Sequence, residues 1–196
     1  MRQLFVVLLV MGLSSCSSKK ELYHIPTFSK NNYVHCVIEI PSGTNSKIEF
    51  NKETKKFEVD LRDGKARMIN FLPYPANYGF ISSTYSNPTD GGDGDALDVI
   101  VISEALRTGS VLEIIPVGIL KLIDDDEYDY KIIGVPADEN LRIINVLSLN
   151  ELKNKYPNIL KILELWFLNY DKKDALETDG WGDEKEALLE IRTAMK

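Results

Sequence analysis

The sequence is poor in the residues on which several common kinds of site depend. Its 196 residues contain two histidines and two cysteines. His24 and His35 are too few and too widely separated to form a histidine metal site. The apolar run from Leu4 to Leu13 is too short to cross a bilayer as a helix. Basic residues are not in excess either. The net charge is -7, which argues against nucleic acid as a partner but leaves room for a small anion held by local cations.

The first residues are typical of a targeting segment rather than of a folded domain. Arg2 precedes the apolar run, which ends in small residues directly before Cys16. This pattern resembles a bacterial lipoprotein signal, in which residues 1–15 are removed and the cysteine becomes the lipidated first residue. We therefore expect a membrane-anchored protein outside the cytoplasm, in the periplasm. The alternative is an ordinary secretory signal that is cleaved near Ser15.

The remaining chain predicts a tether followed by one domain. Residues 16–32 are polar with isolated aromatics, which favours a tether. Residues 33–196 suffice for a single domain with a sizeable core, and they show no internal repeats. If Cys16 carries lipid, Cys36 has no intrachain partner. We expect Cys36 to be a buried, inert thiol.

Short alternating segments followed by helical patterns predict the fold class. The alternation indicates strands at residues 34–40, 47–50, 57–61, 67–72, 99–102, 111–115, 117–123 and 131–135. Pro116 suggests a bulge or an edge position between two of them. After residue 145 the apolar period becomes helical, with Ser148, Pro157 and Asp183 placed to begin helices. The pattern predicts a mainly β fold, a small barrel or sandwich followed by packing helices.

A cluster of carboxylates precedes the apolar run at residues 99–102. Asp93 and Asp95 share one face of an extended chain, whereas Asp98 joins them only if the backbone bends near Gly94. Three such charges repel one another unless a cation joins them, and oxygen ligands suit Mg2+ or Mn2+. The alternative is a polar, glycine-rich turn without a metal. An EF-hand does not fit, because apolar residues stand where its ligands would be needed.

Two further groups of residues suggest a site for a metal and a phosphate together. Asp129 and Lys131 lie on one face at the start of a strand, close to Asp124, although most of this acidic segment is typical of a solvated hairpin tip. Tyr74 and Tyr78 flank a turn from which two hydroxyls could donate to phosphate oxygens. Lys47 and Glu49 also share a strand face, and their simplest interpretation is a surface ion pair.

These motifs occur in the order found in soluble family I inorganic pyrophosphatases, which residues 34 to 195 resemble. The segments that carry the resemblance are Ile38-Glu39-Ile40-Pro41, Lys47-Ile48-Glu49, Tyr74-Pro75-Ala76-Asn77-Tyr78-Gly79, Asp93-Gly94-Asp95-Ala96-Leu97-Asp98-Val99 and Val117-Gly118-Ile119-Leu120-Lys121. The resemblance implies an α+β, mainly β fold, with a five-stranded OB-like β-barrel and flanking C-terminal helices. It also implies a homo-oligomer that hydrolyses diphosphate to two phosphates with Mg2+, or with Mn2+ in its place.

The resemblance further implies a role for individual residues. Asp95 would be the catalytic base that takes a proton from the attacking water. The metal ligands would be Asp93, Asp95, Asp98, Asp124, Asp129 and Glu39. The substrate-binding residues would be Lys47, Arg67, Tyr78, Lys131, Tyr170 and Lys172, with Glu49 and Tyr74 in support.

Departures from the family pattern fall on the phosphate-binding residues. The spacing before Tyr74 is unusual, so either Arg67 or Arg62 could be the phosphate-binding arginine, and we favour Arg67. The family's Tyr-Lys pair appears as Tyr170-Asp171-Lys172, so the lysine role is displaced to Lys172 or lost. A non-catalytic lipoprotein that binds metal or anions, and a hydrolase of longer polyphosphates, are the competing functions.

Overall fold

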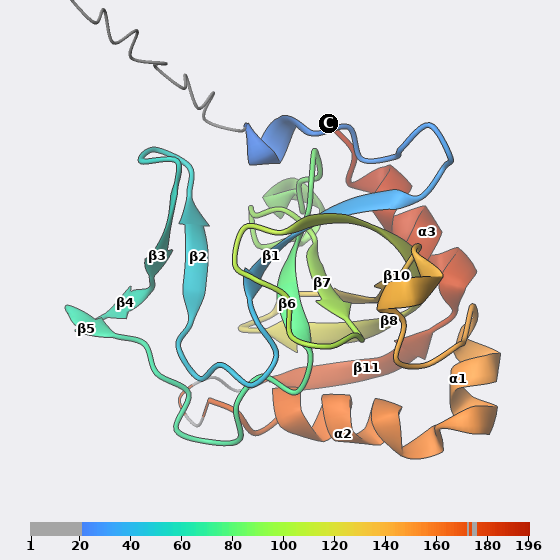
Figure 1. The fold of residues 1–196 in the computed structure, drawn as a ribbon. Coiled ribbons are helices and arrows are strands. Elements are labelled where there is room, and N and C mark those ends of the chain that lie inside the picture. The colour runs from blue at the N-terminus through green and yellow to red at the C-terminus, as the bar shows by residue number, and fades with distance from the viewer. Residues whose placement is uncertain (1–20, 172, 174–175) are drawn as a thin grey trace, which may run out of the picture.

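The computed structural model of the chain describes residues 21–171, 173 and 176–196 (Figure 1). The predicted signal at residues 1–15, the lipidation site Cys16 and the predicted phosphate ligand Lys172 lie outside the described residues. Within the described part of the chain, no helix is long and apolar enough to span a membrane.

Five strands close into a barrel, as predicted. They are β1 (Val34–Ile40), β6 (Asn77–Ile81), β7 (Asp98–Val101), β10 (Lys131–Pro136) and β8 (Val111–Asp124), in that spatial order. β1 also pairs with β8, so the ring has no open edge between its first and last strands. β7 and β10 run parallel, and the other pairings in the ring are antiparallel. The parallel pair brings the first residues of two strands to the same end of the barrel, where a site can be built.

Two local features allow these strands to close. The predicted strands at 111–115 and 117–123 are one continuous strand, β8, whose pairing with β10 shifts register at Pro116. This shift is the bulge that the proline predicted. Where β6 crosses β1, a side chain at Gly79 would place a Cβ only 1.9 Å from the Val37 carbonyl oxygen. Only glycine therefore permits this close approach of the two backbones.

An arm of two small sheets extends from the barrel (Figure 1). β2 (Ile48–Asn51) pairs with β3 (Lys56–Val59), and β4 (Leu61–Arg62) pairs with β5 (Lys65–Ala66). On the other side, β11 (Glu177–Gly182) adds to β8, and β9 (Glu127–Tyr128) pairs with the end of β8. The described residues also form three short 3-10 helices: η1 (Leu22–His24), η2 (Pro88–Asp90) and η3 (Glu139–Leu141).

Three α-helices follow the barrel strands, as predicted. They are α1 (Leu149–Lys155), α2 (Pro157–Phe167) and α3 (Glu184–Thr193). The side chains of Ser148 and Asp183 accept hydrogen bonds from the first-turn N–H groups of α1 and α3, and Pro157 is the first residue of α2. The three predicted helix starts are confirmed.

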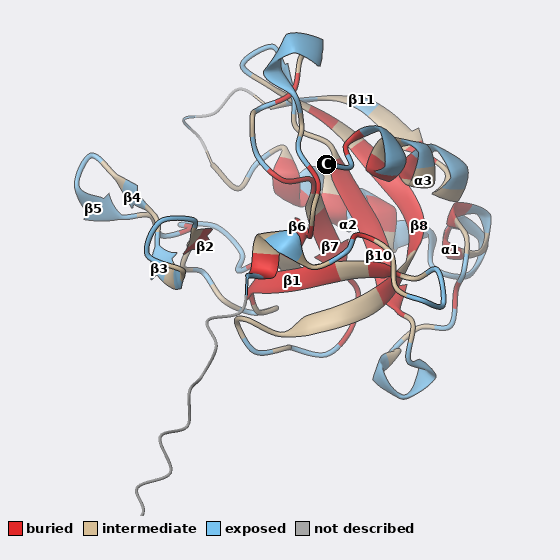
Figure 2. Ribbon diagram, turned by 90° about the horizontal axis from the view of Figure 1, so that it is seen from above, coloured by how far each residue is buried: buried red, intermediate tan, exposed pale blue. Residues whose placement is uncertain are grey.

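The core of the described residues consists of three clusters. Val34, Cys36 and Ile132 pack with Ile191 of α3 in one cluster, and Leu120 and Ile133 pack with Trp166 of α2 in a second. In the third, Val37 and Phe80 of the barrel pack with Phe50 of β2. In Figure 2 the barrel strands are mostly buried, whereas the β2–β5 arm is mostly exposed or half-buried. Cys36 is buried, as expected, and burial raises the pKa of its thiol.

Three sequence-based expectations differ from the structure. Residues 21–32, expected to be part of a tether, pack on the domain, because Leu22 and Thr27 are buried and Thr27 Oγ1 donates to the Ser82 carbonyl. The strand expected at 67–72 is absent from these described residues, where Met68 makes only an isolated bridge. Four strands of the described residues were missed. β6 has a glycine and aromatics that suggested a turn, and β11 has little apolar alternation. The other two, β5 and β9, are only two residues long.

Candidate active site

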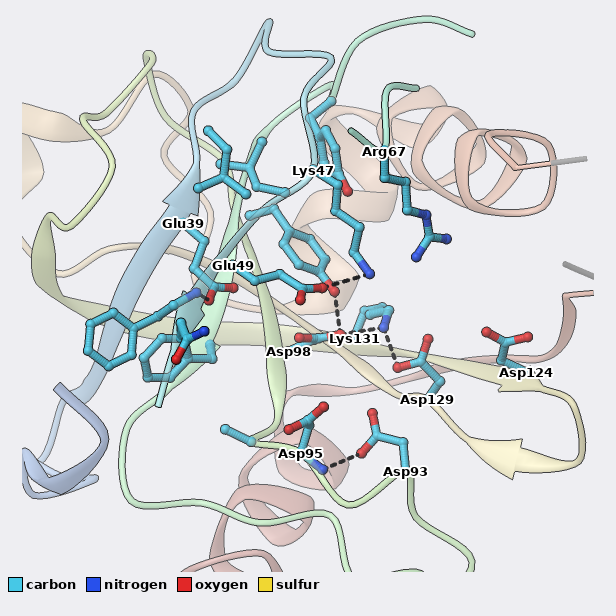
Figure 3. Close-up of a pocket in the computed structure, with 18 of the residues that line it drawn as sticks. Glu39, Lys47, Glu49, Arg67, Asp93, Asp95, Asp98, Asp124, Asp129 and Lys131 are labelled. Carbon is cyan, nitrogen blue, oxygen red and sulfur yellow. Dashed lines mark hydrogen bonds and ion pairs between the residues drawn. The ribbon is translucent and has the colours of Figure 1, made fainter. Parts of the chain in front are cut away.

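A cavity of about 630 Å³ lies between one end of the barrel and the β2–β5 arm. Carboxylates from β7 and from the segments around β8–β10 line one side, and basic residues of the arm line the other. Figure 3 shows this opposition: Lys47 and Arg67 lie across the cavity from Asp93 and Asp95. Within it lie all the predicted site residues that the structure describes. These are Glu39, Lys47, Glu49, Arg67, Tyr74, Tyr78, Asp93, Asp95, Asp98, Asp124, Asp129, Lys131 and Tyr170.

Lys131 stands at the centre of the acidic side. Asp98 is the first residue of β7 and Lys131 the first of β10, and the two are direct neighbours in the parallel pairing. Lys131 Nζ donates to Asp98 Oδ2 at 2.5 Å and also to Asp129 Oδ1. The Tyr78 hydroxyl donates to the same Asp98 oxygen. The expected association of a carboxylate with Lys131 at a strand start is therefore confirmed.

The burial of this group changes its acid–base properties. Burial raises the pKa of Asp98 to about 6, although Lys131 opposes the shift and Asp129 adds to it. Burial by itself would lower the pKa of Lys131, but the neighbouring Asp129 and Asp98 carboxylates outweigh it and hold this pKa above its usual range. Burial and Asp98 raise the pKa of the Tyr78 hydroxyl. Lys131 and Tyr78 therefore remain hydrogen-bond donors at neutral pH.

Asp93 and Asp95 lie on a more exposed turn below this group (Figure 3). The Asp95 N–H donates to Asp93 Oδ1 at 2.9 Å, and Gly94 between them has a φ of 84°. This is the glycine bend that the sequence required for the three carboxylates to face one cavity. Asp95 Oδ1 also accepts from Lys52 Nζ at 2.5 Å. Burial raises the pKa of Asp93, with the nearby Asp129 adding to the effect.

The carboxylates face the same cavity but are not gathered around one point. Among the described residues, no three aspartate, glutamate, histidine or cysteine side chains are close enough together to enclose a metal ion. The tight three-acid cluster expected from the sequence is therefore not formed. Like charges repel, and here Lys131 lies between Asp98 and Asp129 while Lys52 pairs with Asp95. Asp124 lies beyond Asp129, at the end of β8 (Figure 3).

Glu39 is the buried carboxylate of the site. It lies on β1, is 6% exposed, and accepts a hydrogen bond from the Phe50 N–H at 2.7 Å. Burial raises its pKa to about 8, with Asp98 and Glu49 adding to the effect and the Phe50 hydrogen bond opposing it. Glu39 therefore connects the barrel wall to β2 of the arm, in addition to the metal role implied by the resemblance.

Ion pairs hold the basic side of the cavity. Lys47 Nζ lies 2.8 Å from Glu49 Oε1, as the shared strand face predicted. Arg67 Nη1 lies 3.5 Å from Asp60 Oδ2, and the Arg67 carbonyl accepts from the Lys47 N–H at 3.0 Å. The two cations are thus neighbours on adjacent segments. They place positive charge on the side of the cavity opposite Asp93 and Asp95.

Aromatic packing fixes the tyrosines that close the back of the cavity. The Tyr74 ring lies 5.4 Å from Tyr78 and 4.7 Å from Trp166 of α2. The Tyr170 ring stacks on Trp166 at 4.7 Å, just beyond the end of α2. The helix thereby positions Tyr170 toward Lys47 and Arg67, which both oppose the burial that raises its pKa.

Sequence analysis missed three residues that line the cavity or hold it. Lys52 binds Asp95, Tyr23 lines the cavity beneath Lys52, and Asp171 accepts hydrogen bonds from two arginines. Lys52 lies in a polar hairpin turn and Tyr23 in the supposed tether, so neither had a local pattern to reveal it. Both Arg62 and Arg67 line the cavity, so lining the cavity does not distinguish them as the phosphate-binding arginine.

The donor set of the acidic side fits a hard divalent cation. Every carboxylate there offers oxygen ligands, the type that Mg2+ and Mn2+ prefer. Burial disfavours the ionised forms of Asp98 and Glu39 and so raises the pKa of each carboxyl. Cations bound near these residues would favour the ionised forms.

Comparisons with known proteins agree with this site. The family model described as inorganic pyrophosphatase matches residues 36–196. The chain is 34% identical over 167 residues to an inorganic pyrophosphatase of Neisseria meningitidis serogroup B, covering 83% of this chain and 87% of that protein. It is 35% identical over 168 residues to an inorganic pyrophosphatase of Sulfolobus acidocaldarius, covering 83% and 90% of the two chains.

A solved structure has the same fold. The inorganic pyrophosphatase of Thermus thermophilus superposes with a TM-score of 0.76 at 30% sequence identity, covering 89% of this chain and 97% of that one. The family match spans the barrel, the arm and the helices, and so includes every described residue of the candidate site except Tyr23. The chain belongs to the inorganic pyrophosphatase family.

Proposed function

We propose that the protein hydrolyses inorganic diphosphate to two phosphates, with Mg2+ as the activating metal and Mn2+ as a substitute. The observation that carries this proposal is the division of one cavity into a carboxylate side and a basic side. A carboxylate side alone would repel a polyanion, so it can act on diphosphate only through metals. When bound, metal ions neutralise phosphate charge and lower the pKa of a coordinated water.

The residues of the chain would divide the remaining tasks. Asp93, Asp98, Asp124, Asp129 and Glu39 would hold the metals. Asp95 is on the exposed turn, where its Oδ atoms can accept a proton from an attacking water. Lys47, Arg67 and Tyr170 face the cavity from the opposite side and would bind and orient phosphate oxygens. Lys131 and Tyr78 would stabilise the charge on the leaving group by donating hydrogen bonds.

The direct test is phosphate release. The purified protein is incubated with diphosphate, tripolyphosphate and ATP, with Mg2+, with Mn2+ and with EDTA. We expect release from diphosphate that requires a divalent metal and is fastest with Mg2+. Equal release from all three substrates would favour a general polyphosphate hydrolase. No release between pH 6 and 9 would support a non-catalytic metal- or anion-binding protein instead.

We also propose that Cys16 carries a lipid that anchors the domain outside the cytoplasm. The support is the apolar run that precedes the cysteine and the small residues between them. The Cys16→Ser variant should move from the membrane to the soluble fraction on fractionation. Wild-type protein that is soluble in the cytoplasm would contradict the anchor without affecting the proposed activity.

We propose, finally, that the protein is a homo-oligomer. Large apolar side chains are exposed on α2 and on the segment between β5 and β6, which meet where Trp166 Nε1 donates to the Leu72 carbonyl at 2.8 Å. They include Leu72 at 65%, Ile162 at 55% and Leu165 at 50% exposure. Such side chains favour burial against another subunit. Light scattering of the purified protein should give a mass above that of one chain, and a monomer at micromolar concentration would contradict the proposal.

A further inference from the structure

One carboxylate oxygen holds two arginines at the basic end of the cavity. Asp171 Oδ2 accepts from Arg62 Nη1 at 2.8 Å and from Arg67 Nη2 at 3.0 Å. Both arginines line the cavity. The Asp171 and Arg67 side chains are only 15% and 13% exposed, so this contact is shielded from solvent and from salt.

The three residues come from separate parts of the fold. Arg62 ends β4 and Arg67 follows β5, so both belong to the arm, whereas Asp171 lies beyond the end of α2. Asp171 thus ties the outer half of the arm to the helices behind the cavity. Two guanidinium groups so close together would repel one another without a carboxylate between them. Arg67 of this group lies across the cavity from Asp93 and Asp95 (Figure 3).

The shape of a guanidinium allows it to bind a carboxylate and a phosphate at the same time. It presents five N–H donors in a planar fork, so an arginine bound to a carboxylate through one edge can direct another edge at a phosphate. Asp60 restrains Arg67 in the same way from a second direction, at 3.5 Å. Guanidiniums that are already oriented lose less side-chain entropy when an anion binds.

We propose that Arg62 contacts the substrate phosphate beside Arg67, and that Asp171 is a positioning residue that holds both guanidiniums in place. This inference rests on the proposed hydrolysis of diphosphate and assigns its basic end two arginines instead of one. The phosphate bound there is the one farther from Asp93 and Asp95. Asp171 acts only through the arginines and does not itself touch the anion.

The test compares Arg62→Gln with Lys65→Gln in the full chain. Lys65 is a matched control, because it pairs with Arg62 across the same hairpin and is exposed outside the cavity. A hydrogen bond to a charged group is worth roughly 1.5–3 kcal/mol, so Arg62→Gln should raise KM for magnesium diphosphate by about 10- to 100-fold. The kcat should change by less than about threefold, because this contact forms before and during reaction alike. Lys65→Gln should leave both constants within about twofold.

The role of Asp171 requires a second comparison. Asp171→Asn should raise KM about tenfold, and Asp171→Glu, which retains the carboxylate, should recover part of the loss. In the double variant with Arg62→Gln, the Asp171→Asn substitution should add much less than it does alone, because its effect passes through the arginines. Effects that multiply fully would show that Asp171 does not act through Arg62. Thermal unfolding of each variant checks that the fold is retained.

Binding of inorganic phosphate in the presence of Mg2+, measured by calorimetry, separates this inference from the proposed function. Arg62→Gln should weaken phosphate binding about tenfold or more, and Lys65→Gln should not. An Arg62→Gln variant that matches Lys65→Gln in both KM and phosphate affinity would overturn the role of Arg62 while leaving hydrolysis intact. An inactive wild type would remove the proposed function, but the calorimetric difference would still support Arg62 as an anion ligand.

Discussion

The two sides of the cavity are built in different ways. The acidic side is attached to the closed barrel, where β10 is buried along its whole length and β7 along all but its first residue. The basic side is attached to the arm, in which Phe50 is the only buried residue among the four strands β2–β5. The contrast is visible in Figure 2. A continuous hydrogen-bonded sheet positions the carboxylates, whereas ion pairs position many of the cations.

This difference indicates which contacts can be removed by substitution without disturbing the fold. A strand register is cooperative and specifies every residue along it, so Asp98 and Lys131 are fixed by the same ladder that forms the core. The ion pairs of Asp171 with Arg62 and Arg67, by contrast, join side chains of short or irregular segments. Substitutions on the barrel side should therefore affect folding and chemistry together, and those on the arm should affect substrate binding more selectively.

The largest effect should follow removal of the metal. Chelation deprives the acidic side of its cations and leaves the basic side unchanged. Metals contribute several kcal/mol to such reactions, so turnover should fall by about a thousandfold or more. The measurement is phosphate release with EDTA, followed by restoration with excess Mg2+. Full activity in a verified metal-free sample would show that the basic residues of the arm suffice for turnover without metal ions.

Asp95→Asn and Asp98→Asn test whether Asp95 is a general base and Asp98 a metal ligand. Asp95→Asn keeps the volume and one oxygen but removes the charge, and loss of a general base costs about 10²–10⁴ in rate. Its Mg2+ affinity should fall much less than its turnover. Asp98→Asn should lose both, because a ligand charge is removed. Mg2+ titrations of activity and of binding check this. Near-native turnover of Asp95→Asn at saturating Mg2+ would rule out the base assignment, and equal losses of metal affinity would make Asp95 chiefly a ligand.

Two lysine substitutions compare the strength of the ion pairs. Lys131 is 4% exposed as a side chain and binds two carboxylates of the barrel wall, whereas Lys52 is 52% exposed and binds Asp95 from the arm. Lys131→Met should lower the free energy of unfolding of the metal-free protein by about 3–5 kcal/mol, because buried charges lose their partner. Lys52→Gln should lower it by less than about 1 kcal/mol. Urea unfolding in EDTA measures both, and equal losses would contradict the comparison.

The smallest expected effect is on stability. It concerns how the contribution of Asp171, which binds the arginines of the arm, depends on pH. Burial of Asp171 raises its pKa. The hydrogen bonds from the Lys173 N–H and the guanidinium of Arg67 outweigh burial and hold this pKa below its usual value. A lowered pKa stabilises the folded state above the usual pKa of the carboxyl, and this contribution is lost as the pH falls through the folded value. Wild type should therefore exceed Asp171→Asn in unfolding free energy at pH 7, by about 1 kcal/mol or less, and this advantage should shrink as the pH falls below the usual pKa of the carboxyl. Asp63→Asn, on the exposed β4–β5 turn, is the control. A difference that does not shrink as the pH falls would mean that charge is not its cause.

The difference between the barrel side and the arm side of the cavity also explains which features could be predicted from the sequence. Alternating apolar residues specify barrel strands, and the bounds of β1 agree with the prediction because burial and alternation coincide there. β6 escaped detection because Gly79, which is needed for the crossing with β1, looks like a turn residue in isolation. On the acidic side, the bend at Gly94 follows from a local rule, and so does the position of Asp129 beside Lys131. The pairing of Asp98 with Lys131 depends on the parallel alignment of β7 and β10, which the sequence did not reveal.

The basic side was harder to predict because its contacts join distant segments. Arg62 and Asp171 are 109 positions apart in the sequence, and Lys52 and Asp95 are 43 apart. No periodicity marks such a pair, since each member sits in an irregular or short element. The strand expected at residues 67–72 is wrong for a related reason: its apolar side chains are mostly exposed, and only Ile69 is buried. The assigned metal and phosphate roles stay predictions until ligands are bound.

The pairing of β1 with β8 also has a consequence for how the protein folds. It joins Val37 to Val111, which are far apart in the sequence, so the ring can close only after the segments between them have been brought together. Contacts that are this distant in sequence slow folding, and barrels of this kind typically fold in milliseconds to seconds. Asp98 and Lys131 meet only when β7 and β10 pair within that ring. The catalytic cavity should therefore be among the last features to form, and refolding followed by recovered activity should lag behind refolding followed by helical circular dichroism.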